Sequence, residues 1–167
     1  MAFDFAKAGR ALHGYSSDTH LGYQQIKPMM LDELSQKLKG FNLNWQYEKF
    51  IEANQKLIPA QPGVYMFIVR PRSANIEHHC IILYFGESGN LRSRFKQYVA
   101  ERDGVKPTDR EHIKVMLNIY KNRLDFAYVT LGRYQTNEVE DLLIDAFDPC
   151  CNHKKSAVAS SPAFLGE

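Results

Sequence analysis

The chain has 167 residues, 44% of them hydrophobic, and its 21 Lys and Arg against 19 Asp and Glu give a formal net charge of +2. This length fits one domain with an appendage, and 20 well-spread aromatic residues (10 Phe, 9 Tyr and 1 Trp) exclude a largely disordered chain. No apolar run approaches the roughly 20 residues that span a bilayer, and the N-terminus lacks a signal-peptide core, so we expect a cytoplasmic protein.

Helices are expected in the N-terminal third of the chain. Residues 31–39 place three leucines on one helical face and are followed by glycine, which commonly stops a helix. Residues 45–57 show a second amphipathic pattern, and Pro59 and Pro62 prevent it from continuing. We therefore interpret residues 1–58 as a helical N-terminal extension.

Two almost continuously apolar runs follow, at residues 63–69 and 80–86. Such runs indicate strands that are covered on both faces. The turn-forming residues between them, 70–79, favour an antiparallel hairpin with a long loop. Asn90 is a suitable cap for a helix over residues 91–100.

The C-terminal part repeats this mixture of elements. Residues 110–122 carry one apolar stripe, residues 125–131 indicate a third strand, and a last core helix ends before Pro149. This order predicts an α+β fold, a small three-stranded antiparallel sheet flanked by helices. We assign it to residues 59–153 and interpret residues 154–167 as a tail.

Positive charge is concentrated in the middle of the chain. Residues 92–123 hold nine Lys and Arg against four Asp and Glu. Such a surface is the usual footprint of phosphate contact, and an ordinary solvated helix face is the alternative. The residues expected to bind a nucleic-acid backbone are Arg92, Lys96, Arg102, Lys106, Arg110 and Lys114.

Four residues in and after the apolar runs could serve phosphodiester chemistry. Tyr65 and Tyr84 each lie two positions from a glycine, although strands favour tyrosine and each alone is typical of a core residue. Arg94 and Tyr98 are four positions apart and share a helical face. An arginine can brace a phosphate, and a tyrosine can orient water or accept its proton if its pKa is lowered.

Glu140 has two interpretations. Asn137 and Glu140 match an N-x-x-E capping box, in which the glutamate would only secure the start of a helix. A carboxylate near a helix start can also bind a divalent cation, and Glu138 offers a second acidic side chain nearby.

Together these residues resemble the GIY-YIG nuclease family over residues 60–153. GVY at residues 63–65 and YFG at residues 84–86 are similar to the two halves of its signature, and an arginine follows the second half at the family's spacing. The stretch EDLLIDAFDPCCN is similar to the E-x-x-L-I-x(4)-P-x-x-N pattern of excision-repair members. That match selects Glu140 over Glu138 and marks Asn152.

The resemblance implies a metal-dependent DNA endonuclease, compact and restriction-like or phage-type, that acts on double-stranded DNA as a dimer or higher oligomer. It implies one divalent ion, Mg²⁺ or Mn²⁺, per active site, with Glu140 as the ligand. Tyr65 would be the general base or water-orienting group, Tyr84 would support the nucleophile or phosphate, and Arg94 would stabilise phosphoryl charge. The implied catalytic set is Tyr65, Tyr84, Arg94, Tyr98, Glu140 and Asn152.

The chain departs from the family pattern in two places. The loop at residues 70–79 makes the two halves of the signature unusually distant. Many members have a lysine directly after the second half, whereas this chain has Glu87, an acid that repels phosphate. These departures leave an alternative, a catalytically weak GIY-YIG-like module that binds DNA or a protein.

Overall fold

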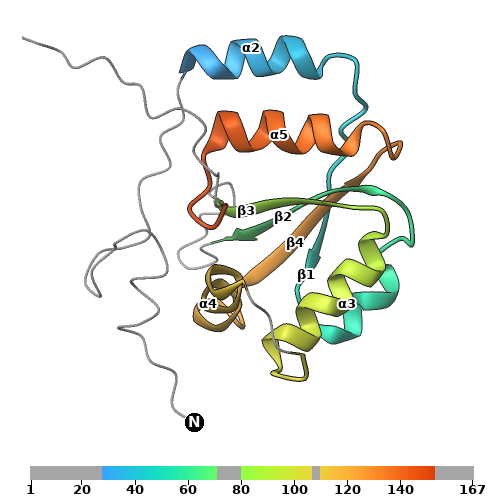
Figure 1. Cartoon of the computed structure of the whole chain (residues 1–167), viewed down its shortest axis with the longest axis vertical. Coiled ribbons are helices and arrows are strands. Elements are labelled where there is room, and N and C mark those ends of the chain that lie inside the picture. Colours follow the sequence, from blue (N-terminus) through green and yellow to red (C-terminus); the bar gives the residue numbers. More distant parts are fainter. Residues whose placement is uncertain (1–27, 71–79, 107–109, 153–167) are drawn as a thin grey trace, which may run out of the picture.

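A computed structural model describes residues 28–70, 80–106 and 110–152 (Figure 1). The elements in chain order are α2 (Pro28–Leu38), β1 (Gln46–Lys49), the 3-10 helix η1 (Glu52–Leu57), β2 (Gly63–Val69), β3 (Ile81–Ser88), α3 (Leu91–Arg102), α4 (Glu111–Ile119), β4 (Leu124–Thr130) and α5 (Thr136–Phe147). None of the described helices is long and apolar enough to cross a membrane. The expected long loop and C-terminal tail lie outside the described residues.

The sheet confirms the expected α+β fold but has four strands rather than three. All neighbouring strands are antiparallel, in the order β1-β4-β2-β3. The additional strand, β1, comes from the segment 45–57, for which a helix was the wrong prediction. Its residues pair with β4, and only Glu52–Leu57 form a short helix. Pairing with an available strand edge outweighed a weak helical periodicity in this short segment.

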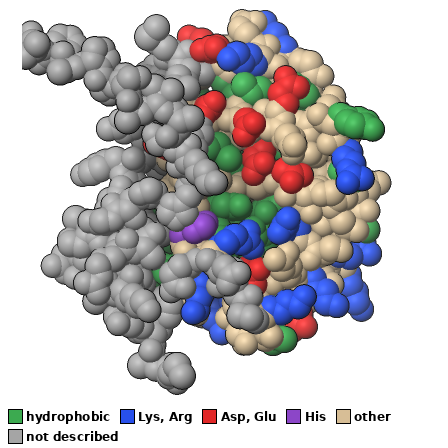
Figure 2. Space-filling model, viewed as in Figure 1, with side chains coloured by type: hydrophobic (Ala, Val, Ile, Leu, Met, Phe, Trp, Pro, Cys, Tyr) green, Lys and Arg blue, Asp and Glu red, His purple; other side chains and the backbone are tan. Residues whose placement is uncertain are grey.

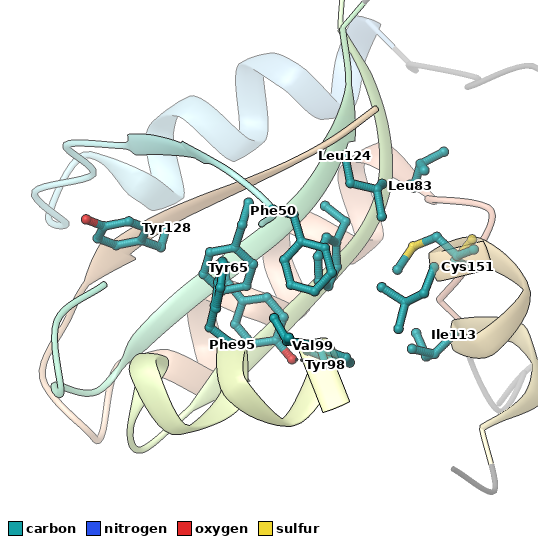
Figure 3. Packing of buried hydrophobic residues seen from close by; sticks show 14 of the residues in the cluster. Phe50, Tyr65, Leu83, Phe95, Tyr98, Val99, Ile113, Leu124, Tyr128 and Cys151 are labelled. Atoms are coloured by element: carbon teal, nitrogen blue, oxygen red, sulfur yellow. Dashed lines mark hydrogen bonds between the residues drawn. The ribbon is translucent and has the colours of Figure 1, made fainter. Parts of the chain in front are cut away.

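The sheet is covered by helices on both faces (Figure 1). The face toward α3 and α4 carries Tyr65, Phe67 and Phe126, and the face toward α5 carries Val64 and Met66. The α3-side cluster is rich in aromatic rings, and Phe50 packs with its ring centroid 5.0 Å from those of Phe67 and Phe95 (Figure 3). The prediction that the apolar strands are covered on both faces is confirmed.

Both glycines of the motif permit a close approach. A Cβ atom at Gly86 would lie 2.3 Å from the Oη of Tyr65, and one at Gly63 would lie 2.1 Å from the carbonyl oxygen of Val129. Neither distance is possible for a side chain, so glycine is required for packing at both positions. The motif therefore has a structural cause that is separate from any chemistry.

Candidate active site

Three tyrosines gather on the α3-side face of the sheet. In the β2–β3 register Tyr65 lies opposite Gly86 and Tyr84 lies opposite Phe67, so the two tyrosines share one face. Their ring centroids are 6.2 Å apart. Tyr98 approaches from α3, and its Oη lies 2.8 Å from the Oη of Tyr65 (Figure 3). Chain segments separated by more than thirty positions thus form one hydroxyl cluster.

The three phenols differ in their access to solvent. Tyr65 and Tyr98 are buried, with 1% and 0% of their surface exposed, whereas Tyr84 is only partly buried. Burial raises the pKa of Tyr65 well above its usual value, and neighbouring tyrosines raise it further while Arg94 opposes the shift. Burial likewise raises the pKa of Tyr84. Both hydroxyls are therefore protonated at neutral pH and available as hydrogen-bond donors.

Arg94 lies in the second turn of α3, which begins as the sequence predicts: the side chain of Asn90 accepts a hydrogen bond from the N–H of Ser93 at 3.0 Å. The Nη1 of Arg94 donates to the Oε1 of Gln97 at 3.0 Å. Its charge opposes the rise in the pKa of Tyr65 and also that of Glu140. The guanidinium therefore acts on the tyrosine cluster and on the glutamate together.

Glu140 is not the cap of α5. The helix begins at Thr136, the residue before it makes no side-chain capping hydrogen bond, and Asn137 lies inside the helix. The capping-box interpretation is therefore wrong. The carboxylate of Glu140 instead accepts a hydrogen bond from the backbone N–H of Glu87 in β3. Glu140 thus faces the outer strand of the sheet, and its charge affects the partly exposed Tyr84.

The carboxyl group of Glu140 lies where a negative charge is disfavoured. Burial raises its pKa to about 7, Glu87 and Asp141 contribute to the rise, and the Glu87 N–H and Arg94 oppose it. A bound cation would relieve this penalty. Among the described residues no group of three or more His, Cys, Asp and Glu is placed to hold a metal. Magnesium often takes one or two carboxylates and completes its shell with water and phosphate oxygens, so Glu140 with Glu87 beside it fits such an ion.

The outward edge of β3 is hydrogen-bonded to the C-terminal segment at Leu83 and Phe85. The N–H of Cys151 donates to the carbonyl oxygen of Leu83 at 2.9 Å. The side chain of Asn152 accepts from the N–H of Phe85 at 2.8 Å and donates to its carbonyl oxygen at 2.9 Å. The side chain of Asn152 therefore makes the two backbone hydrogen bonds that a neighbouring strand would make, and it holds the β3 backbone in place between Tyr84 and Gly86. Its hydrogen bonds place it as a support for the site.

The six expected nucleic-acid-binding residues fall into three groups, of which Arg110 alone is the third. Arg92 donates to the carbonyl oxygen of Ile58 at 2.7 Å, and Arg102 donates to that of Phe50 at 3.0 Å, so both join α3 to the segment around η1. Three lysines remain exposed: Lys96, Lys106 and Lys114. Figure 2 shows Lys and Arg side chains gathered over the α3 side of this view, with acidic side chains over α5.

Arg110 has a different environment from the one expected. Its Nη1 donates to the Oη of Tyr98 at 3.2 Å, and its Nη2 donates to the Oε1 of Glu101 at 3.1 Å. The side chain of Glu101 is 3% exposed. Glu101 was not among the expected site residues, although it lies seven positions after Arg94 on the same helix, and this spacing places both residues on one face.

No protein-family model matches the chain, and no curated protein is significantly similar to it in sequence. In structure, the chain is similar to the GIY-YIG N-terminal endonuclease domain of UvrC from Thermotoga maritima bound to its catalytic divalent cation, magnesium. The TM-score is 0.44 and the identity 19%, over 64% of this chain and 99% of that chain. A point mutant of the same domain, also bound to its catalytic divalent cation, aligns with a TM-score of 0.44 and 18% identity over the same shares. These domains are of the family that the sequence resembles.

Proposed function

We propose that this chain is a metal-dependent endonuclease that hydrolyses phosphodiester bonds in DNA at the β3 edge of its sheet. The observation that supports the proposal is that Tyr65 and Tyr84 pack together and that the charges of Arg94 and Glu140 act on them, although the four residues come from four different elements. Phosphodiester hydrolysis needs an oriented water and stabilisation of the phosphate charge, and a phenol, a guanidinium and a cation-binding carboxylate can supply these.

Each residue has a task that follows from its position. Glu140, with Glu87 beside it, would hold one Mg²⁺ or Mn²⁺ ion, which supplies Lewis-acid stabilisation of phosphate charge when bound. Arg94 braces a non-bridging phosphate oxygen with its planar donors. Tyr84 is partly exposed, so its hydroxyl can orient the attacking water. The general-base role implied for Tyr65 would also require the phenol to lose its proton, which burial opposes by raising its pKa, so we assign Tyr65 the water-orienting role. In that role its hydroxyl exchanges its bond with Tyr98 for one with water.

A plasmid-nicking assay tests the proposal directly. Wild-type protein is incubated with supercoiled plasmid in Mg²⁺, in Mn²⁺ and in EDTA, and the open-circular product is followed over time. We expect nicking that depends on the divalent cation. Absence of cleavage of both DNA and RNA substrates in either metal, by protein that is folded, would contradict the proposal.

A second function, DNA binding without cleavage, is favoured by one observation. Glu87 accepts a hydrogen bond from the hydroxyl of Thr136 at 3.4 Å and adds negative charge beside Glu140. Two neighbouring acids repel a scissile phosphate unless a cation neutralises them. Binding of DNA that is unchanged by Mg²⁺, without product in the nicking assay, would select this function.

A further inference from the structure

A continuous hydrogen-bond chain runs along α3 and into the tyrosine cluster. Arg94 donates to Gln97 at 3.0 Å, and the Nε2 of Gln97 donates to the Oε1 of Glu101 at 2.8 Å. Positions 94, 97 and 101 are separated by three and four residues, so they follow one another on a single helical face. From Glu101 the chain of hydrogen bonds passes to a residue outside α3.

Arg110, which lies outside α3, is the next member of this hydrogen-bond chain. It donates to both carboxylate oxygens of Glu101, at 3.1 and 3.3 Å, and to the Oη of Tyr98 at 3.2 Å. Tyr98 in turn shares its hydrogen bond of 2.8 Å with Tyr65. The guanidinium also lies over the ring of Tyr98, 5.1 Å from its centroid. One planar group therefore fixes both the acid and the phenol.

The burial of Glu101 shows that this arrangement is more than a surface ion pair. Its side chain is 3% exposed, and an uncompensated buried carboxylate is costly. Arg110 is 32% exposed in its side chain and compensates that charge. Both of its terminal nitrogens donate into the protein, one toward Tyr98 and the other toward Glu101, and this direction differs from that of a contact with a DNA backbone.

We propose that Arg110 is a positioning residue of the active site, held by Glu101, and that it orients Tyr98 and through it the hydroxyl cluster with Tyr65. This inference rests on the proposed endonuclease function. Because Arg110 occupies a lone pair on the Oη of Tyr98, it restricts the direction in which that hydroxyl can donate its own proton. Through Gln97, the same acid also restrains Arg94.

The test compares Arg110→Met with Arg110→Lys and with Arg123→Met, which removes an exposed arginine outside the chain of hydrogen bonds. For each variant kcat and KM are measured by plasmid nicking in Mg²⁺. DNA binding in Ca²⁺ is measured as a function of salt, and the melting temperature is recorded.

We expect Arg110→Met to lower kcat by about 10- to 100-fold, the range seen when a partner that orients a metal-site ligand is lost. KM and the salt slope of DNA binding stay at wild-type values, because the substitution leaves every phosphate contact in place. Arg110→Lys recovers only part of the rate, since one ammonium cannot reproduce a planar fork shared between two partners. Arg123→Met leaves kcat unchanged.

Glu101→Gln provides the second variant, because glutamine keeps the shape and one acceptor. We expect its kcat to fall, and the double variant with Arg110→Met to be no slower than the more impaired single variant, as expected for residues that act as a unit. Reductions in kcat that multiply instead would overturn the proposal.

Two other outcomes are distinct. If Arg110→Met raises KM and lowers the salt slope by about one while kcat stays unchanged, Arg110 is a DNA contact and the proposal fails. If the wild-type protein cleaves no nucleic acid, the proposed function itself fails and this inference falls with it.

Discussion

The two faces of the sheet are built from the same strands, but they differ in chemistry. The face toward α5 is lined by Val64, Met66, Ile68 and other apolar side chains. The face toward α3 carries Tyr65 and Tyr84, and Tyr98 of α3 packs against it with Arg110 as a charged partner. Because side chains alternate along a strand, neighbouring residues of the same motif lie on opposite faces of the sheet. The α5-side face therefore only holds the fold together, whereas the α3-side face also carries residues proposed for the reaction. Glu140 of α5 lies beside Glu87 of β3, at the edge where the two faces meet.

The largest effect is expected from Glu140→Gln, which tests whether α5 contributes chemistry as well as packing. Glutamine can still accept the hydrogen bond from the N–H of Glu87 and carries no charge where a charge is disfavoured, so the melting temperature should not fall. Nicking in Mg²⁺ should fall by more than about 100-fold, because loss of an outer partner alone costs about 10- to 100-fold in metal sites.

Glu138→Gln is the matched control, since it neutralises an exposed acid on the same helix. It should cleave like the wild type. Near-normal cleavage by Glu140→Gln would remove Glu140 from the mechanism and leave Glu138 or Glu87 as the candidate ligand.

A pair of substitutions compares the two faces directly. Ile68→Ala on the α5-side face should cost about 2–5 kcal/mol of unfolding free energy while folded molecules still cleave. Tyr65→Phe on the α3-side face should cost only about 0.5–1.5 kcal/mol for one hydrogen bond, yet reduce the cleavage rate. Denaturant titration and nicking at 20 °C, about the temperature of maximum stability, measure both quantities. An equal decrease of activity in the two variants would contradict the prediction that only the α3-side face contributes to cleavage.

Gly86→Ala should disturb the α3-side face through packing. The new Cβ would lie 2.3 Å from the Oη of Tyr65, so the ring must move, at a cost of about 1–3 kcal/mol. Gly89→Ala is the control, because a Cβ there would meet nothing within 4 Å. Denaturant unfolding of both variants measures the difference. Equal stability would show that the tyrosine ring has room to shift.

The pH dependence of the unfolding free energy should reveal the titration of the Glu140 carboxyl group. The pKa of Glu140 is raised from 4.5 to about 7 in the folded protein. Its contribution to stability is therefore complete below pH 4.5 and is lost as the pH rises through about 7. Because the charged form binds cations, Mg²⁺ should raise the melting temperature more at pH 8 than at pH 5.

Glu140→Gln supplies the control for this pH dependence, because glutamine does not titrate. Its melting temperature should lack this pH-dependent step. An identical effect of Mg²⁺ in the wild type and in Glu140→Gln would show that the ion binds elsewhere.

The smallest effect concerns the exposed lysines outside the tyrosine cluster. Charge reversal of Lys106 and Lys114 together should weaken DNA binding and reduce its salt slope by about one for each phosphate that is no longer neutralised. Fluorescence anisotropy with labelled duplex DNA over a range of salt measures this slope. An unchanged affinity at low salt would mark this surface as merely solvated.

Local patterns in the sequence determined most of the elements. Leucine spacing predicted α2, Asn90 predicted the start of α3, and the apolar runs predicted β2 and β3, because each signal lies within a few residues of the element that it specifies. The motif spacing also singled out Tyr65 and Tyr84, which the β2–β3 register places on one face of the sheet.

Tertiary structure decided what depends on distant partners. Residues 46–49 form a strand because their backbone pairs with the free edge of β4. The bulge between Phe67 and Ile68 keeps Tyr84 opposite Phe67 while Ile82 turns to the other face, and strand alternation alone does not reveal such a shift. Glu140 of α5 is hydrogen-bonded to the backbone of β3, and Arg110 is hydrogen-bonded to two side chains of α3. These interactions join segments far apart in the chain, so only the folded arrangement determines them.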